Sequence, residues 1–126
     1  MREILRKHHI SFKNAIAGMG WAFRTQPNFR VHFAFSVFVL LLAAYFRISR
    51  VETAVLVFAI ILGLGSEMIN TSLESMTDLI TKEWRNEAKI AKDVAAGMML
   101  LVATGAVLVA LVIFAPYISS WVGWSK

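Results

Sequence analysis

Four residues that could carry chemistry follow an apolar stretch of the chain: Glu67, Asn70, Glu74 and Asp78. Their spacing of i, i+3, i+7 and i+11 places the side chains within roughly 80° on one face of an α-helix. Carboxylates one or two helical turns apart can share a hard cation, and one of them can act as a general base. Phosphoryl transfer to an alcohol needs both roles. Spacing alone leaves open the alternative of a solvated helix end whose acids pair with nearby basic residues.

A second cluster of charged residues, over 89–93, precedes the last apolar segment. Lysines there could hold the phosphates of ATP, or they could simply anchor the helix at the membrane surface. The sequence contains no G-x-x-x-x-G-K-[ST] motif, which excludes a P-loop mechanism. It contains no cysteine, so a bound metal must have oxygen ligands, and Mg²⁺ is the first candidate. Nothing in the sequence pairs with His32, which we interpret as an anchor of the first span.

The composition favours a membrane protein. Hydrophobic residues make up 58% of the 126 residues, and the mean hydropathy is +0.64, which is high for a soluble domain. The net charge of +5 comes from basic residues that flank the apolar segments rather than forming a separate patch. We therefore expect a membrane as the partner and no nucleic acid.

The apolar segments predict an all-α membrane protein with one domain over 1–126. Pro27 marks a helix start, and stretches of about 20 apolar residues are long enough to cross the bilayer. The expected elements are an interfacial amphipathic helix over 1–27, spans over 29–48, 51–80 and 94–116, and a cytoplasmic connector over 82–93. The span over 51–80 is expected to continue into the cytoplasm.

The distribution of basic residues predicts the orientation of the chain. Six Lys and Arg residues precede the first span and four lie in the connector, which together are ten of the thirteen in the chain. The positive-inside rule then places the N-terminus and the connector in the cytoplasm and the C-terminus outside. The expected location is the cytoplasmic (inner) membrane.

Three motifs together resemble those of a known family. The sequence E-M-I-N-T-S-L-E-S-M-T-D over 67–78 is followed by A-K-D over 91–93, and N-F-R-V-H over 28–32 begins the first span. This set, which extends over nearly the whole chain, is similar to the signature of the small prokaryotic diacylglycerol and undecaprenol kinases. The form of 28–32 is more typical of the undecaprenol kinase branch.

The resemblance implies a homotrimer with active sites shared between subunits, ATP as co-substrate, Mg²⁺ as cofactor and a lipid alcohol as acceptor. By position, Glu67 would take the proton from the lipid hydroxyl, and Glu74 would ligate Mg²⁺. Asn70 would order the site, and Asp78 would lie near the nucleotide. The residues implied on the nucleotide side are Lys92, Asp93, Glu83, Trp84, Arg85, Asn14 and Lys7.

One position departs from the family pattern: Gln26 stands where the family has a second metal-ligating glutamate. An amide oxygen can ligate Mg²⁺ but brings no negative charge, so we expect weaker metal binding. A catalytically silent family member therefore remains an alternative. A small membrane transporter or assembly subunit is another, although the acids gather at one end of a single span. The residues do not distinguish the acceptor, because undecaprenol and diacylglycerol both present a primary hydroxyl beneath an apolar body. The form of 28–32 alone makes undecaprenol the favoured acceptor and diacylglycerol the next.

Overall fold

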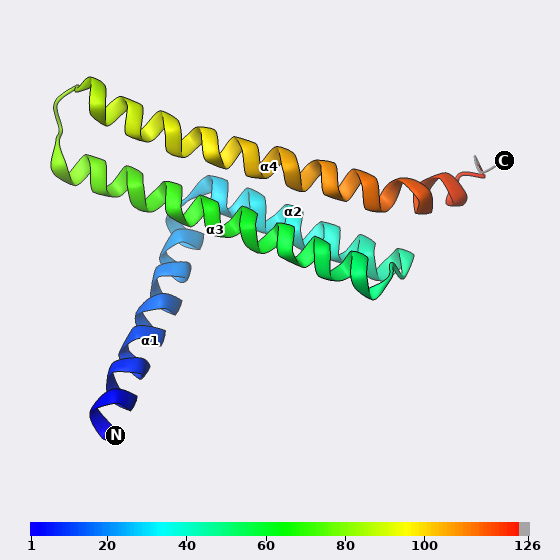
Figure 1. Ribbon diagram of the computed structural model, residues 1–126, viewed down its shortest axis with the longest axis horizontal. Coiled ribbons are helices and arrows are strands. Elements are labelled where there is room, and N and C mark those ends of the chain that lie inside the picture. The colour runs from blue at the N-terminus through cyan, green and yellow to red at the C-terminus, as the bar shows by residue number, and fades with distance from the viewer. Residues whose placement is uncertain (124–126) are drawn as a thin grey trace.

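The structure is a computed structural model, which describes the chain over residues 1–123, except for the side chains at positions 2, 5 and 7. The described chain is helical throughout, which confirms the all-α prediction. Three of its helices lie side by side with their axes roughly parallel, whereas the first leaves this bundle at a steep angle (Figure 1). In chain order the helices are α1 (Arg2–Thr25), α2 (Pro27–Phe46), α3 (Arg50–Ile80) and α4 (Asn86–Trp121).

Local sequence explains where the helices break. Gln26 has an extended backbone (φ −100°, ψ 110°) and Pro27 occupies the first turn of α2, where its missing N–H is not needed. Arg47 ends α2 in the left-handed conformation (φ 52°). Ser49 and Glu52 then start α3 with a capping box, in which each side chain accepts the other residue's backbone N–H at 3.2 and 2.8 Å.

Three helices are long and apolar enough to cross a membrane: α2, α3 and α4. The 20 residues of α2 correspond to about 30 Å, the thickness of the hydrocarbon core. The 31 residues of α3 and the 36 of α4 correspond to about 46 and 54 Å, so both must extend beyond it. Their joined ends continue past the point where α1 meets α2 (Figure 1).

The last helix is longer than the span that the sequence predicts within it. α4 begins at Asn86, so most of the segment expected as the connector is helical. It also continues through Pro116 as far as Trp121, because a proline removes only one backbone donor and the helix is held elsewhere by its packing. The non-helical link between α3 and α4 is therefore restricted to residues 81–85.

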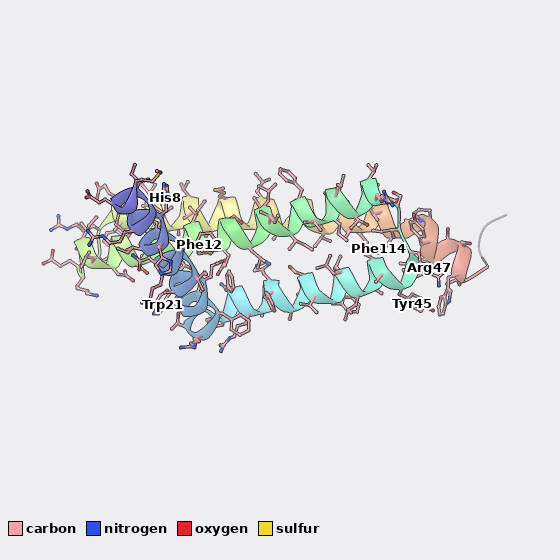
Figure 2. All side chains as sticks on the ribbon, turned by 90° about the horizontal axis from the view of Figure 1, so that it is seen from below. His8, Phe12, Trp21, Tyr45, Arg47 and Phe114 are labelled. Atoms are coloured by element: carbon pink, nitrogen blue, oxygen red, sulfur yellow. The ribbon has the colours of Figure 1, made fainter. Side chains whose placement is uncertain are left out.

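The bundle has a small apolar core at the end away from α1. The core consists of Ala43, Leu56, Ile113 and Phe114, one or two residues from each of the three long helices. Figure 2 shows Phe114 at this end, together with Arg47 from the turn between α2 and α3. A polar contact closes the same end, since the hydroxyl of Tyr117 donates to Glu52 Oε2 at 2.7 Å. This bond ties the start of α3 to the last turns of α4.

We predict that Tyr117→Phe lowers the midpoint of thermal unfolding in detergent by a few degrees. The substitution keeps the ring but removes the donor to Glu52, which also caps α3. Tyr45→Phe is the matched control, because Tyr45 lies at the same end of the bundle with its side chain exposed. Equal midpoints for the two variants would show that the bond between α3 and α4 contributes no stability.

Candidate functional site

The polar residues predicted on one face of a helix do share a face of α3, and their surroundings change along it. Glu67 is 2% exposed and Asn70 is 7% exposed, whereas Glu74 is half-buried and Asp78 is exposed. The amide Nδ2 of Asn70 donates to Glu74 Oε1 at 3.1 Å, one turn further along. The polar face of α3 therefore begins at the buried carboxylate of Glu67 and ends at the solvent-exposed carboxylate of Asp78.

Two neighbouring helices surround the buried end of this face. On the α4 side, Ser66 next to Glu67 donates to Met99 Sδ at 3.2 Å, and Met99 is itself buried. On the α2 side, the His32 side chain points into the space between α2, α3 and α4, which Gly63, one turn before Glu67, also lines. The carboxylate is thus held at the junction of α2, α3 and α4 rather than at a solvated helix end.

Two oxygen atoms in this junction have no hydrogen-bond partner among the described residues: Glu67 Oε2 and Asn70 Oδ1. Buried polar atoms are almost always paired, because an unpaired one costs about 1–3 kcal/mol. Two free acceptor oxygens can accept a hydrogen bond from a hydroxyl or ligate a cation.

The oxygen atoms of this polar face suit the usual coordination of Mg²⁺ in proteins. Glu67, Asn70 and Glu74 offer only oxygen atoms as acceptors, which are the ligands that Mg²⁺ prefers. Within the described part of the chain, no three His, Cys, Asp or Glu residues are grouped so as to hold a metal by themselves. Mg²⁺ is usually held by one or two carboxylates together with substrate phosphates, and these residues can supply that share.

An open groove of about 630 Å³ lies beyond this polar face, between the C-terminal end of α3 and the N-terminal end of α4. Its lining contains four cationic side chains that can face phosphates (Lys82, Arg85, Lys89 and Lys92), and the indole of Trp84, which is 79% exposed. Six residues that the sequence predicts near the nucleotide line this one groove: Asp78, Glu83, Trp84, Arg85, Lys92 and Asp93.

Ion pairs hold the charged residues of this groove. Lys92 Nζ lies 2.5 Å from Asp78 Oδ1 and so links α4 to α3, while Lys89 pairs with Asp93 within α4. The alternative that the sequence left open, in which the acids of this face pair with basic residues, therefore describes Asp78. It does not describe Glu67 or Glu74, for which the described residues include no ion pair.

Three predicted site residues are not joined to this cluster. Asn14 is exposed on α1. Gln26 is half-buried between α1 and α2, and the hydrogen bonds described for it are those of its backbone, to Ala22 and Arg30. The side chain of Lys7 lies outside the described residues.

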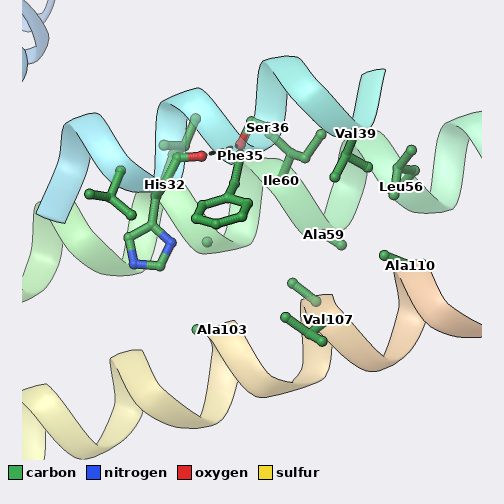
Figure 3. A pocket seen from close by; sticks show the side chains of 14 residues that line it. His32, Phe35, Ser36, Val39, Leu56, Ala59, Ile60, Ala103, Val107 and Ala110 are labelled. Atoms are coloured by element: carbon green, nitrogen blue, oxygen red, sulfur yellow. Dashed lines mark hydrogen bonds between the residues drawn. The ribbon is translucent and has the colours of Figure 1, made fainter. Parts of the chain in front are cut away.

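Sequence reasoning missed the neighbours of Glu67. We interpreted His32 as an anchor, yet its ring points into the space between α2, α3 and α4 (Figure 3). Ser66 and Met99 have no motif of their own. One feature of the sequence could have indicated Met99 as a neighbour of the site. Met99 lies seven residues after Lys92, and this spacing places both side chains on the same face of α4.

Comparison with known proteins agrees with this geometry. The model of the prokaryotic diacylglycerol kinase family matches residues 13–114, which is most of the chain and includes both the buried junction and the groove. The chain belongs to this family. It is thus related to a group of bacterial membrane enzymes that phosphorylate lipids.

Two characterised relatives carry different names. A protein of Synechocystis sp. named diacylglycerol kinase is 43% identical over 101 residues, which are 79% of this chain and 58% of that protein. The chain thus covers less than two thirds of that relative. A protein of Bacillus subtilis named undecaprenol kinase is 35% identical over 116 residues, which are 91% of this chain and 94% of that protein.

We predict that Glu67→Met raises the free energy of unfolding by about 1–3 kcal/mol, because it removes a buried oxygen that has no partner. Chemical denaturation in one detergent, without nucleotide or divalent cation, measures the change. Glu83→Met, at an exposed position, is the control and should leave stability unchanged. A loss of stability in Glu67→Met would mean that this carboxylate is paired in the folded protein.

Proposed function

We propose that this protein is an ATP- and Mg²⁺-dependent lipid kinase, which transfers the γ-phosphoryl group to the primary hydroxyl of a membrane lipid. The observation that carries the proposal is the position of Glu67. It is a buried carboxylate with a free oxygen, on the same helix face that leads to a groove lined by cationic side chains. A base on the membrane side and a phosphate site on the water side are the two parts that such a transfer requires.

Glu67 acts as the general base. Its unpaired Oε2 accepts the proton of the lipid hydroxyl while the lipid oxygen forms a bond to the γ-phosphorus. The bond between this phosphorus and the oxygen that bridges it to the β-phosphate breaks at the same time, and ADP leaves with that oxygen. The buried junction of α2, α3 and α4 keeps water away, so the lipid hydroxyl is the available acceptor.

The groove between α3 and α4 binds ATP. Lys92, now paired with Asp78, is the cation that contacts the phosphates, and Arg85 adds a second positive charge. Trp84 offers an exposed aromatic face for the base of the nucleotide. Asp93 and Glu83 are in ion pairs that hold Lys89 and Arg85 at the rim.

Mg²⁺ neutralises the charge of the ATP phosphates when it is bound. Glu74 is the residue that holds it, and the bond from Asn70 keeps the Glu74 carboxylate turned toward the buried junction. Gln26 contributes an amide oxygen in place of a carboxylate. The metal site is thus weaker by one negative charge than in relatives that have glutamate at this position.

Undecaprenol is the favoured acceptor and diacylglycerol the next. The N-F-R-V-H form of residues 28–32 supports undecaprenol, and so does the undecaprenol kinase of Bacillus subtilis, whose length this chain matches almost completely. The greater identity to the Synechocystis diacylglycerol kinase supports the other acceptor, over a smaller part of that protein.

The active protein is a homotrimer in the cytoplasmic (inner) membrane, with the N-terminus inside and the C-terminus outside. α1 lies on the membrane surface, since it leaves the bundle at a steep angle and carries exposed apolar side chains, such as Phe12 and Ile16. Asn14 of this helix reaches a neighbouring subunit's nucleotide groove, and the family resemblance assigns Lys7 to the nucleotide side as well.

A transporter or assembly subunit remains the candidate from another class. It would need polar groups along the membrane interior, where a proton or cation could pass. The buried polar side chains described for the three long helices gather at the end that holds Glu67, whereas the opposite end has an apolar core beside the bond between Tyr117 and Glu52. This distribution supports the kinase.

The test is transfer of labelled phosphate from ATP to undecaprenol and to diacylglycerol by the purified protein in detergent, with Mg²⁺ present or chelated. We predict Mg²⁺-dependent transfer, which Glu67→Gln reduces by at least about a thousandfold while ATP still binds. Glu87→Gln, at an exposed position at the start of α4, is the control. Normal turnover in Glu67→Gln would refute the role of this base, and no transfer to either lipid by the unmodified protein would refute the proposed kinase.

A further prediction concerns the departure at position 26. Gln26→Glu should lower the Mg²⁺ concentration needed for half-maximal activity by about tenfold, because it restores a negative charge to the metal site. Titration of activity with Mg²⁺ at saturating ATP measures this. Ser11→Asp, which adds a negative charge at an exposed position of α1 that has no role in the proposed site, is the comparison. An unchanged titration in Gln26→Glu would mean that residue 26 does not ligate the metal.

A further inference from the structure

An apolar cleft of about 280 Å³ lies between α2, α3 and α4 in the membrane-spanning part of the bundle. Figure 3 shows side chains of all three helices lining it, with His32 at one end and Leu56 and Ala110 at the other. Small residues leave the space open on the side of α4, where Ala103, Ala106 and Ala110 line it.

The polar groups of this cleft are confined to the end near Glu67. His32 and Ser36 are its two polar lining side chains, and Ser36 donates back to His32 O at 2.8 Å. Gly63, which also lines the cleft, precedes Glu67 by one helical turn. Glu67 thus lies one turn beyond the lining of the cleft, which is polar at the His32 end and apolar away from it, as a long-chain alcohol is.

We propose that this cleft holds the hydrocarbon chain of the acceptor lipid, with its hydroxyl at the His32 end beside Glu67. The inference rests on the proposed function and adds the position of the chain and the class of acceptor. The cleft volume corresponds to roughly nine groups of the size of a methylene or a water molecule, at about 30 Å³ each. One chain fits this space, so the protein selects alcohols with a single hydrocarbon chain over lipids with two.

A helix from a second copy is the rival occupant. One turn of a helix about 10 Å across fills roughly 420 Å³, more than the cleft offers. The bilayer, in contrast, supplies hydrocarbon chains at every depth of the three spans. The mouth of the cleft also carries no charged side chain other than His32, so nothing there repels a lipid chain.

Two substitutions fill the cleft from opposite sides. A side chain added at Gly63 of α3 has no atom within 4 Å of its Cβ, so Gly63→Leu projects into the cleft without a backbone clash. Ala106→Phe fills it from α4, away from Glu67 and the nucleotide groove. Gly105→Leu is the matched control, because Gly105 is exposed, has the same free space at its Cβ and does not line the cleft.

The first measurement is the KM for a long single-chain alcohol. Both cleft variants should raise the KM for this alcohol about tenfold, because each prevents about two methylene groups of the lipid from being buried. The KM for ATP and the unfolding midpoint should stay unchanged. Gly105→Leu should behave as the unmodified protein. An unchanged lipid KM in both cleft variants, with phosphorylation continuing, overturns the cleft and leaves the kinase intact.

The second measurement does not depend on turnover. A long-chain alcohol carrying a photoreactive diazirine on its chain is activated in the complex, and the labelled peptides are identified by mass spectrometry. The proposal predicts labels on cleft residues of α2, α3 and α4. Excess undecaprenol should remove these labels more readily than excess diacylglycerol does. This result supports the proposal even where the unmodified protein phosphorylates neither lipid. Labels confined to the outer faces of the helices overturn it.

The chain contains no cysteine, which allows a direct test of the rival occupant. Ala106→Cys introduces a single thiol into the cleft. A disulfide between copies of this variant after mild oxidation would show that a second copy fills the cleft and would overturn the proposal. A variant that stays free of such a disulfide and is still labelled by the photoreactive alcohol supports it.

Discussion

The packing of α4 along α3 removes a carboxylate from water at the end of a membrane span, and the rest of the site follows from this. Glu67 is almost fully buried, although its helix runs on into a charged segment. The bond from Ser66 to Met99 and the ion pair of Lys92 with Asp78 join the two helices on either side of it. Burial of a charged group is costly, and such a residue is retained where its chemistry is used.

The same pairing separates two environments along one helix face. Between Glu67 and Asp78 the face of α3 passes from a dry junction to an exposed groove, a distance of about 16 Å at 1.5 Å per residue. An apolar chain can approach from one end of this face and a polyphosphate from the other. An enzyme that transfers a phosphoryl group from a soluble nucleotide to a lipid alcohol, as we propose for this chain, needs both approaches. A continuous helix that extends past the bilayer provides them without a separate domain.

The opposite end of the bundle serves a different purpose. There the apolar core and the bond between Tyr117 and Glu52 fix how α3 and α4 cross the membrane together. Small residues of α4 between this core and the junction leave the apolar cleft open. The bundle is thus closed by packing at one end and by ion pairs at the other, with its unfilled space between them.

The sequence by itself determined the helices, their order and the polar face of α3, because these depend on local periodicity, on Pro27 and on the spacing of four residues. It also predicted the six residues that line the charged groove, through motifs that lie close together in the chain. Only the tertiary structure decided that Glu67 is buried while Asp78 is exposed, that His32 points into the space between the three long helices, and that an apolar cleft lies there. These properties depend on which helices meet at a given height. Packing between residues far apart in the chain, such as Ser66 and Met99, determines which helices come into contact. A local sequence pattern does not contain this information.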